Sequence, residues 1–493
     1  MTLSANVTSK FFLRFLPAFL CLAWIALLAF PNQVQSASAN KKRSAEVRNQ
    51  FTSPESLAYP VLEYRIPEAK RIALDNGMIL YWLGDHELPI IRMSVLVRTG
   101  SAYDPPDQPG LAELSCRAMR TAGTLHWRGD ELDDQLDRHA IHISCRTDLE
   151  LVRFSLNTLK ENLEEAVELF SEIMTTPRFD PKKVLIEKEL MLEEIRRIED
   201  NPQEFAFREF RKHLYRGNPR GNQKSIPSIS GIQVADLADF HHEYFYPENM
   251  MIAVTGDISL EETIRVLSSR FPSPSRKHRI APLPAPDLRS DGRVIIIPKE
   301  IPQSVVLAGF AAPAKNTSDY HAFSILDFVL GSGGFRSRIF QEIRNDLGLA
   351  YSAGSFYSAR TEYGVLSAYS MTKTDTTLRV LDAMKSIITD VAGSLLKPEE
   401  VRWAQRSITN NFLFSFANAE QIVHQQMMSE YEGLPEEFLI QYRQNIQKVK
   451  PLEIKALAAR YLRLDQATIL ILGDEKGFDH PVRNTGAAIP PAH

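Results

Sequence analysis

The feature that most constrains the fold of this chain is an internal repetition in the order of its elements. Two apolar strand-like runs, over residues 250–255 and 467–472, each end in a Gly-Asp pair. Each run closes a segment of roughly 190 residues in which strands come first and helices follow. Two segments of similar length and similar order predict two modules of the same architecture.

Within each half, short strands occur together and helices occur together. This grouping predicts an α+β fold of two homologous α/β sandwich domains, each an antiparallel-rich sheet with helices on one face. In the first half, strands are expected over residues 71–83, 90–98, 141–155 and 250–255, and helices from Gly110 and over 159–175 and 181–199. In the second half, strands are expected over residues 293–297, 303–311, 350–361, 364–372 and 467–472, and a helix over 318–330.

Length and composition indicate how the chain is divided. A chain of 493 residues is too long for one hydrophobic core. Residues 272–292 are rich in Pro, Ser, Arg and Lys, which is typical of a linker. The predicted division is a signal peptide at 1–39, a tether at 40–67, an N-terminal domain at 68–271, a linker at 272–292, a C-terminal domain at 293–478 and a flexible tail at 479–493.

The N-terminus has the order of a secretory signal peptide. Lys10 and Arg14 precede an apolar run over residues 15–30, and residues 37–39 read Ala-Ser-Ala, a small-residue cleavage site. The apolar run is shorter than the ~20 residues that a membrane span needs. We therefore expect an exported protein, periplasmic or secreted, with no stable membrane span after cleavage. An uncleaved membrane anchor is the alternative.

Composition also restricts the class of partner. Charged residues make up 24% of the chain and the formal net charge is -4. No basic stripe runs along the sequence that would follow a phosphate backbone. We therefore expect no nucleic-acid partner.

Two cysteines, Cys116 and Cys145, remain after the apolar N-terminal run. Two cysteines are too few for a disulfide framework. In an oxidising compartment they can form one bridge, and otherwise they are two free thiols. The sequence leaves both arrangements open.

No familiar catalytic motif occurs in the sequence. The zinc motifs H-E-x-x-H and H-x-x-E-H, the nucleophile elbow G-x-S-x-G and the phosphate-binding loop are all absent. The helix expected over residues 181–199 carries Glu187 and Glu194 two turns apart, which places both on one face. From this spacing alone, the expected role is a solvated acidic surface.

A series of short segments gives the chain a recognisable family pattern. In the first half they are Arg-Thr-Gly-Ser-Ala at 98–102, Pro-Gly-Leu-Ala at 109–112, Gly-Thr at 123–124, Thr-Pro-Arg-Phe at 176–179, Glu-Glu-Ile at 193–195, Tyr-Pro-Glu-Asn-Met at 246–250 and Val-Thr-Gly-Asp at 254–257. In the second half they lie at 330–340, 342–344 and 348–352. In this order and spacing, they resemble the inverzincin metallopeptidases, which include pitrilysin, insulinase and the mitochondrial processing peptidase. The resemblance covers residues 68–478 and implies two halves that form a clam-like chamber.

The resemblance also shows where zinc chemistry is expected, and the residues there have changed. Active relatives carry H-x-x-E-H directly after Gly-Leu-Ala, with two zinc-binding histidines, a general-base glutamate and a distal glutamate ligand. Here the first ligand position is Glu113, the base position is Cys116 and the second ligand position is Arg117. The distal position is kept as Glu194, with Glu187 a further match. Arginine stays protonated and cannot bind a metal, so we expect Arg117 to pair with Glu194 or Glu113.

The second half keeps residues that the resemblance assigns to substrate. In the family, an Arg–Tyr pair preceded by a glycine-rich segment contacts the substrate backbone. Arg344 and Tyr351 match the pair, and Gly331, Gly333 and Gly334 match the glycine-rich segment. The resemblance therefore implies a substrate-binding role for these five residues. The alternative is purely structural: a salt bridge at a strand edge and a core tyrosine.

Loss of the metal motif with retention of substrate contacts implies a non-catalytic subunit. The chain resembles that subunit in the bacterial two-subunit branch, which is similar to the mitochondrial processing peptidase. The expected partner is a zinc-bearing homologous peptidase subunit, and the expected substrates are peptides or unfolded segments. No metal or other cofactor is expected in this chain, and the zinc is expected in the partner. A homodimer stays open beside the heterodimer.

Two other functions stay open. One is a stand-alone peptide-binding or assembly protein, and the other is an active zinc metalloendopeptidase with substitute ligands such as Glu113, Cys116 and Glu194. The sequence gives less support to Cys116 as the nucleophile of a cysteine peptidase, because no histidine base lies near it in sequence. The chain is therefore expected to be inactive by itself.

Overall fold

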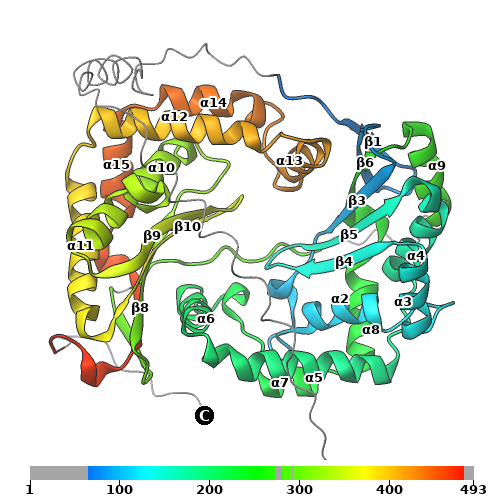
Figure 1. The fold of residues 1–493 in the computed structure, drawn as a ribbon, viewed down its shortest axis with the longest axis horizontal. Coiled ribbons are helices and arrows are strands. Elements are labelled where there is room, and N and C mark those ends of the chain that lie inside the picture. Colours follow the sequence, from blue (N-terminus) through cyan, green and yellow to red (C-terminus); the bar gives the residue numbers. More distant parts are fainter. Residues whose placement is uncertain (1–64, 272–279, 291, 482–493) are drawn as a thin grey trace, which may run out of the picture. The chain divides into compact units, whose positions relative to one another are not determined.

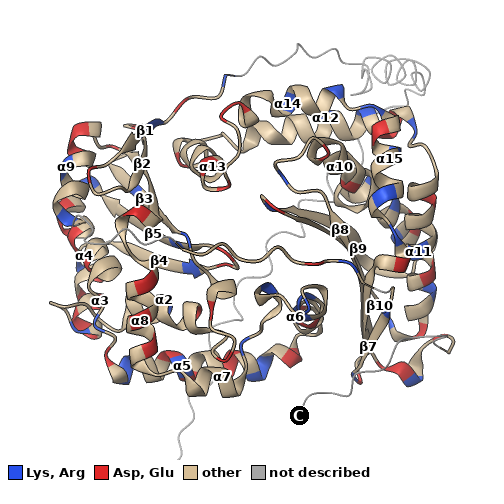
Figure 2. Ribbon diagram, turned by 180° about the vertical axis from the view of Figure 1, so that it is seen from behind, with Lys and Arg blue, Asp and Glu red and all other residues tan. Residues whose placement is uncertain are grey.

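The computed structural model describes residues 65–271, 280–290 and 292–481. The predicted signal peptide, nearly all of the tether, part of the linker and most of the tail lie outside these ranges. Within them, every helix is too short or too polar to traverse a lipid bilayer. Acidic and basic residues are intermixed along the helices of both halves (Figure 2).

The first half of the chain forms a six-stranded sheet in the order β1-β2-β6-β3-β5-β4. Only β2 and β6 are parallel, and every other neighbouring pair is antiparallel. Seven helices, α2, α3, α4, α5, α7, α8 and α9, contribute side chains to the core of this half (Figure 1). The strands are β1 (Lys70–Ala73), β2 (Ile79–Gly84), β3 (Ile90–Val97), β4 (His142–Thr147), β5 (Val152–Leu159) and β6 (Met250–Gly256). The helices are α2 (Leu111–Thr121), α3 (Gly129–Arg138), α4 (Leu163–Thr175), α5 (Pro181–Arg197), α6 (Pro202–Leu214), α7 (Ile226–Gly231), α8 (Val234–Tyr244) and α9 (Leu260–Arg270).

The second half forms a five-stranded sheet in the order β7-β11-β8-β10-β9. Again one pair, β7 and β11, is parallel and the others are antiparallel. The strands are β7 (Val294–Pro298), β8 (Gln303–Ala312), β9 (Ala350–Ala359), β10 (Gly364–Lys373) and β11 (Thr468–Gly473). The helices are α10 (Tyr320–Asp327), α11 (Thr377–Gly393), α12 (Pro398–Phe414), α13 (Ala419–Tyr431), α14 (Phe438–Lys448) and α15 (Pro451–Tyr461).

The two sheets share one topology. The closing strand of each half is inserted between its two opening strands, which gives β2-β6-β3 in the first sheet and β7-β11-β8 in the second. The following strands, β5-β4 and β10-β9, also correspond. The predicted fold class, an α+β chain of two similar sandwich modules, is confirmed.

Burial on both faces explains why the two closing strands are apolar throughout. Ile252 and Val254 of β6 face one core cluster, whereas Met251 and Ala253 face another. Along β11, Ile469 and Ile471 alternate in the same way with Leu470 and Leu472. Successive side chains of a strand point to opposite faces, so a strand covered on both sides needs apolar residues at every position.

The second face of each sheet is covered by a helix from the other half. Phe210 and Leu214 of α6 pack against Leu307 and Leu470 of the second sheet. Met427 of α13 and its neighbours pack against the outer face of β2 and β6 in the first sheet. The two modules therefore exchange one helix each, in addition to the helix layer that the sequence predicts.

Two of the strands expected in the first half are each divided in two. The run expected over 71–83 turns at Asn76 and Gly77, where Gly77 has a φ of 85° and the Asn76 side chain accepts a hydrogen bond from the Met78 backbone N–H. The run expected over 141–155 is interrupted after Thr147 and continues as β5. Each prediction was wrong in extent because an antiparallel hairpin has the same alternating pattern on both of its strands.

A polar cluster fixes the C-terminal end of α13 to the first sheet. Glu430 accepts hydrogen bonds from Arg71 at 2.6 and 2.7 Å and from the Tyr81 hydroxyl at 2.5 Å. Arg98 donates to the Tyr431 carbonyl oxygen at 3.0 Å, and its guanidinium lies 4.6 Å from the centre of the Tyr431 ring. These contacts join residues that lie more than three hundred positions apart in the sequence.

Substituting Glu430→Gln is expected to lower the free energy of unfolding by about 1 kcal/mol at pH 7, since the site is partly exposed. Hydrogen bonds from Arg71 lower the pKa of Glu430 below its usual range. The stabilisation by ionised Glu430 is therefore complete above the ordinary glutamate pKa of about 4.3. It is lost as the pH falls through the lowered pKa of Glu430 in the folded protein. Urea unfolding of both proteins at several pH values measures this difference.

Glu420→Gln, on the same helix, is the matched control because Glu420 makes one long ion pair, 3.6 Å from Arg92. We expect no measurable change from it. Equal losses from Glu420→Gln and Glu430→Gln would contradict a specific role for the Glu430 cluster.

Candidate functional site

Helix α2 positions the residues that replace the zinc motif. The Asp104 carboxylate accepts hydrogen bonds from the backbone N–H groups of Gly110 and Ala112 at 2.7 and 2.8 Å, which caps the helix. Gly110 has a φ of 104°, and a Cβ there would lie 2.3 Å from Ile229, so only glycine fits. Glu113 and Arg117 follow four residues apart on the side of α2 that is not buried in the core.

Helix α5 supplies the opposing carboxylate. It begins at Pro181, where the sequence predicts its start, and it carries Glu194 in its last turn. Asp180 caps it, with its side chain accepting from the backbone N–H groups of Lys182 and Lys183. The two terminal nitrogens of Arg117 donate to the two Glu194 oxygens, each at 2.8 Å. Arg117 Nη2 also donates to Glu113 Oε1 at 2.6 Å. The predicted pairing of Arg117 is confirmed, with both carboxylates at once.

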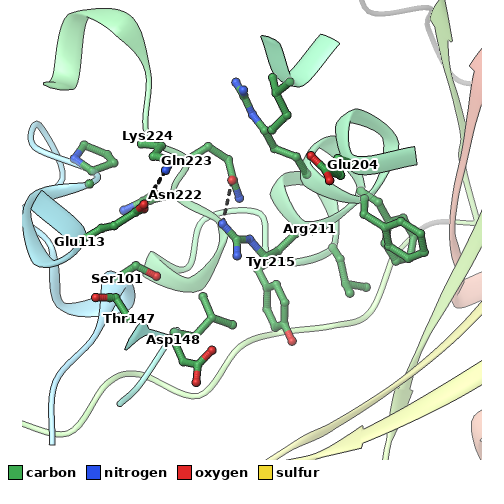
Figure 3. Close-up of a pocket in the computed structure, with 18 of the residues that line it drawn as sticks. Ser101, Glu113, Thr147, Asp148, Glu204, Arg211, Tyr215, Asn222, Gln223 and Lys224 are labelled. Atoms are coloured by element: carbon green, nitrogen blue, oxygen red, sulfur yellow. Dashed lines mark hydrogen bonds and ion pairs between the residues drawn. The ribbon is translucent and has the colours of Figure 1, made fainter. Parts of the chain in front are cut away.

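Lys224 completes this ion network, and sequence reasoning missed it. Its Nζ lies 2.8 Å from both Glu113 oxygens (Figure 3). It also lies 3.3 Å from Glu194 Oε2. Burial alone would raise the pKa of Glu194, but the hydrogen bonds from Arg117 and the charge of Lys224 lower it. Two cations thus neutralise two carboxylates. No local pattern in the sequence marks Lys224, which reaches the site from the loop before α7.

Glu187 does not join the network. It lies two turns before Glu194 on α5, is largely buried, and accepts a hydrogen bond from the Thr121 hydroxyl at 2.9 Å. Its contact is with the C-terminal end of α2, so it ties α5 to α2.

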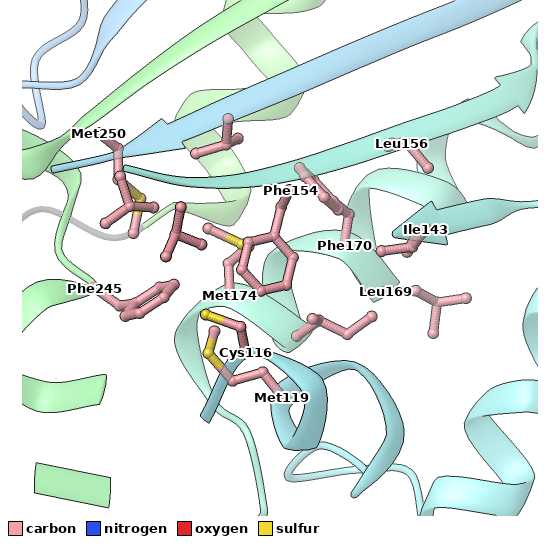
Figure 4. Packing of buried hydrophobic residues seen from close by; sticks show 14 of the residues in the cluster. Cys116, Met119, Ile143, Phe154, Leu156, Leu169, Phe170, Met174, Phe245 and Met250 are labelled. Atoms are coloured by element: carbon pink, nitrogen blue, oxygen red, sulfur yellow. The ribbon is translucent and has the colours of Figure 1, made fainter. Parts of the chain in front are cut away.

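Cys116 points away from this network into the core. Its side chain is 0% exposed and packs near Met119, Phe154, Met174 and Phe245 (Figure 4). Burial raises the pKa of the Cys116 thiol well above its usual value. A buried, protonated thiol is a poor nucleophile, so the geometry does not support peptidase chemistry at Cys116.

Cys145 is also a free thiol in the structure. Its Sγ donates to the Cys116 carbonyl oxygen at 3.3 Å. Burial raises the pKa of Cys145 to about 11. Of the two arrangements left open by the sequence, the structure therefore contains the free thiols.

The residues at the zinc position do not fit zinc. A catalytic zinc site needs three protein ligands with free lone pairs and one open position. Here Glu113 and Glu194 are the only candidates at that position, and both are occupied by Arg117 and Lys224. The guanidinium adds a fixed positive charge where a metal cation would bind. Within the described ranges, no cluster of three or more His, Cys, Asp and Glu side chains is arranged to hold a metal ion.

A cavity of about 950 Å³ lies beside this ion network. Glu113, Glu194 and Lys224 form part of its wall, and α6 crosses it with both polar and aromatic side chains (Figure 3). The outer strands of the second sheet close it on the other side. The remaining wall includes Ser101, Thr147, Asp148, Glu204, Phe207, Arg208, Arg211, Tyr215, Asn222, Gln223, Phe356, Ser358, Arg360, Val365 and Ser367.

Arg344 and Tyr351 lie together, but outside the lining of this cavity. The Arg344 guanidinium lies 4.6 Å from the Tyr351 ring centre and 4.7 Å from that of Phe340. Tyr351 is 81% exposed, so it is not a core tyrosine. Their predicted contact with substrate stays a prediction, and the structural alternative fails for Tyr351.

The three glycines serve different geometric needs. A Cβ on Gly331 would lie 2.2 Å from the Ser355 backbone nitrogen, and a Cβ on Gly333 would lie 2.5 Å from the Trp403 ring. Gly334 has a φ of 69° and open space around it. The first two are explained by close packing and the third by its backbone. A role in substrate binding stays a prediction for all three.

Comparison with known proteins identifies the family. Residues 85–228 match the family model "Insulinase (Peptidase family M16)", and residues 231–408 match "Peptidase M16 inactive domain". The chain belongs to the insulinase family of peptidases, as the sequence motifs predict.

Relatives of known sequence carry the name zinc protease. The uncharacterized zinc protease of Rickettsia felis is 23% identical over 345 residues, which is 69% of this chain and 82% of the relative. The uncharacterized zinc protease YmxG of Bacillus subtilis is 23% identical over 352 residues, 70% of this chain and 84% of the relative.

Solved structures share the fold. A peptidase M16 inactive domain from Pseudomonas fluorescens superposes with a TM-score of 0.74 at 21% identity and covers 86% of this chain and 100% of its own. The periplasmic protease PqqL from Escherichia coli gives 0.68 at 13% identity, over 89% of this chain and 50% of its own. At these identities the likeness establishes the fold alone.

Proposed function

We propose that this chain is the non-catalytic, peptide-binding subunit of a zinc metallopeptidase heterodimer. The observation that carries the proposal is the Arg117 guanidinium, which is bonded to both carboxylates left at the zinc position. The chain has thus replaced a metal centre with an ion network while keeping a large cavity beside it. Zinc and the cleaving step belong to a homologous subunit, and this chain holds peptides or unfolded segments.

The ends of both sheets suit the binding of an extended peptide. Strand β4 ends the first sheet and strand β9 ends the second. Thr147 of β4 and Phe356 and Ser358 of β9 line the cavity. An edge strand offers main-chain donors and acceptors to an extended peptide, while pockets beside the strand select its side chains. Because such binding uses the main chain, we expect this chain to accept unfolded segments of varied sequence.

The proposed location is the periplasm or the cell exterior. The charged, apolar and small-residue order of the first 39 residues supports export. We propose that the partner subunit is exported to the same compartment, because the two chains must meet after folding.

The test combines metal analysis with peptide cleavage by the purified chain, alone and mixed with an H-x-x-E-H homologue. The chain alone is expected to contain no stoichiometric zinc and to cleave no peptide. An equimolar mixture is expected to cleave faster than the homologue alone. Arg344→Ala or Tyr351→Ala is expected to lower kcat/KM of the mixture by at least about tenfold. Stoichiometric zinc with chelator-sensitive cleavage by the chain alone would refute the proposal.

A stand-alone peptide-binding protein is the second candidate. The observation that favours it is that this chain by itself forms a cavity of about 950 Å³ with the strand ends of β4 and β9 in its wall. Peptide binding by the chain alone, with no gain in cleavage on mixing with any zinc-bearing homologue, would support this candidate over the heterodimer.

A further inference from the structure

Two arginines of α6, Arg208 and Arg211, line the cavity one helical turn apart. The Nε atoms of both are buried and have no hydrogen-bond acceptor among the described residues. An arginine carries five N–H donors, and a buried donor without an acceptor is costly. Among the described side chains, Arg211 donates one hydrogen bond, from Nη2 to Gln223 Oε1 at 2.7 Å. The Arg208 Nε lies 3.8 Å from Glu209 Oε1, too far for a hydrogen bond.

Among the described carboxylates, only Glu209 forms an ion pair with either arginine, and that contact with the Arg208 Nε is long, at 3.8 Å. Glu113 and Glu194 are already paired with Arg117 and Lys224. Glu204 and Asp148 also line the cavity, but neither forms an ion pair with Arg208 or Arg211 in the described structure. Burial lowers the pKa of Arg211, and the like charge of Arg208 acts in the same direction. This part of the cavity therefore has two buried guanidinium Nε donors without an acceptor among the described residues.

An apolar surface lies next to the arginines. The rings of Phe207, from α6, and Phe356, from β9, have centres 6.0 Å apart. Val365 of β10 and Leu214 of α6 also line the cavity. A ligand for this place combines an anionic group with an aromatic or aliphatic side chain.

We propose that the cavity binds a carboxylate of an extended peptide at Arg208 and Arg211, with the adjacent apolar side chain of the peptide on Phe207 and Phe356. A carboxylate can accept two parallel hydrogen bonds from a guanidinium, which suits it better than any neutral group. The carboxylate is either the C-terminus of the peptide or an Asp or Glu side chain. This inference rests on the proposed function, because it names the class of peptide that the subunit holds.

The test measures the affinity of the full chain for matched peptides by isothermal titration calorimetry. Four acetylated and amidated octapeptides of Ser and Gly carry Phe followed by Glu, Gln, Lys or Ser. A fifth peptide ends in Phe with a free carboxylate. We expect the Glu peptide, the free-carboxylate peptide or both to bind about tenfold to a hundredfold more tightly than the Gln peptide. Comparing the Glu peptide with the free-carboxylate peptide shows whether the site prefers a side-chain carboxylate or a C-terminus.

Arg208→Gln and Arg211→Gln are each expected to remove this preference. Arg265→Gln is the matched control, because Arg265 lies on α9, pairs with Glu164 and is remote from the cavity lining. It is expected to keep the preference. If a variant fails to fold, the affinities of the five peptides for the unsubstituted chain still test the inference.

The possible failures can be told apart. Equal affinity for the Glu, Gln and free-carboxylate peptides overturns this inference and leaves peptide binding intact. A carboxylate preference that survives both arginine substitutions also overturns it. Binding of none of the five peptides overturns the proposed function together with this inference.

Discussion

Replacing Arg117 with alanine is expected to lower the free energy of unfolding by about 2 to 3 kcal/mol. The substitution removes three hydrogen bonds of 2.6 to 2.8 Å and leaves Glu113 and Glu194 with Lys224 as their only cation. Removing one partner of a buried ion pair costs about 3–5 kcal/mol. The expected loss is smaller because Glu194 is 47% exposed and solvent screens part of the charge.

Urea unfolding of the purified chain measures this loss, with two comparisons. Arg197→Ala, on α5, removes an exposed i,i+4 pair with Glu193 and is expected to cost about 0.5 kcal/mol or less. A neutral replacement of the whole network, Arg117→Met and Lys224→Met with Glu113→Gln and Glu194→Gln, is expected to cost less than Arg117→Ala alone. It leaves no uncompensated charge behind. A loss below 0.5 kcal/mol for Arg117→Ala would show that water compensates the carboxylates fully.

The Arg117 network shows how far sequence reasoning reaches. Arg117 was assigned a carboxylate partner because it stands at a ligand position beside a surviving ligand. The contact with Glu194 follows from that logic. Lys224 does not, because a lysine in a loop has no periodicity or motif that places it. Its position depends on how the chain returns from α6 to α7, which only the tertiary structure defines.

The fold, like the ion network, has one part that the sequence predicts and another that it does not. The order of elements predicts two similar sheets with helices on one face of each. Burial of β6 and β11 on both faces is a finding of the structure, and it explains the continuous apolar runs that close the two halves. The helices that cover the second face of each sheet could not be predicted from the sequence. Helix α6 was not predicted from the sequence, and nothing in its apolar positions at Phe210 and Leu214 shows that they face the other half's sheet. Periodicity identifies an apolar face but not the surface that covers it.

The candidate binding residues show a similar limit. The resemblance names Arg344 and Tyr351, which the structure places in contact with each other. Arg208 and Arg211 belong to no motif, and they stand out only because their buried Nε atoms have no acceptor. The Arg–Tyr pair that the resemblance assigns to substrate and the unused donors of Arg208 and Arg211 are independent grounds for peptide binding. Agreement between their tests would place both along one bound peptide.

The double substitution Glu113→His with Arg117→His is expected to create a zinc site. Positions 113 and 117 lie on one face of α2, and Glu194 already lies within hydrogen-bond distance of the side chain at 117. Two imidazoles and a carboxylate form a three-ligand set with an open fourth position. We expect stoichiometric zinc with a dissociation constant near ~1 µM, which corresponds to about 8 kcal/mol of binding free energy.

Two measurements test zinc binding by this double variant without relying on peptidase activity. At free zinc a hundredfold above the dissociation constant, linkage is expected to raise the free energy of unfolding by about 2.7 kcal/mol. Cobalt substitution should give the visible spectrum of a tetrahedral ion. Adding Lys224→Ala is expected to tighten binding, because Lys224 lies 3.3 Å from Glu194 and repels a cation.

Glu113→Gln with Arg117→Gln is the control for the new zinc site, since it removes the same charges without supplying imidazoles. It should bind no zinc and show no linkage. Even with zinc bound, the histidine variant is expected to cleave no peptide, because the base position is Cys116, whose thiol is buried in the core. Failure of the histidine variant to bind zinc would mean that α2 and α5 have moved apart since the motif was lost. Cleavage by it would mean that another group in the cavity serves as the base.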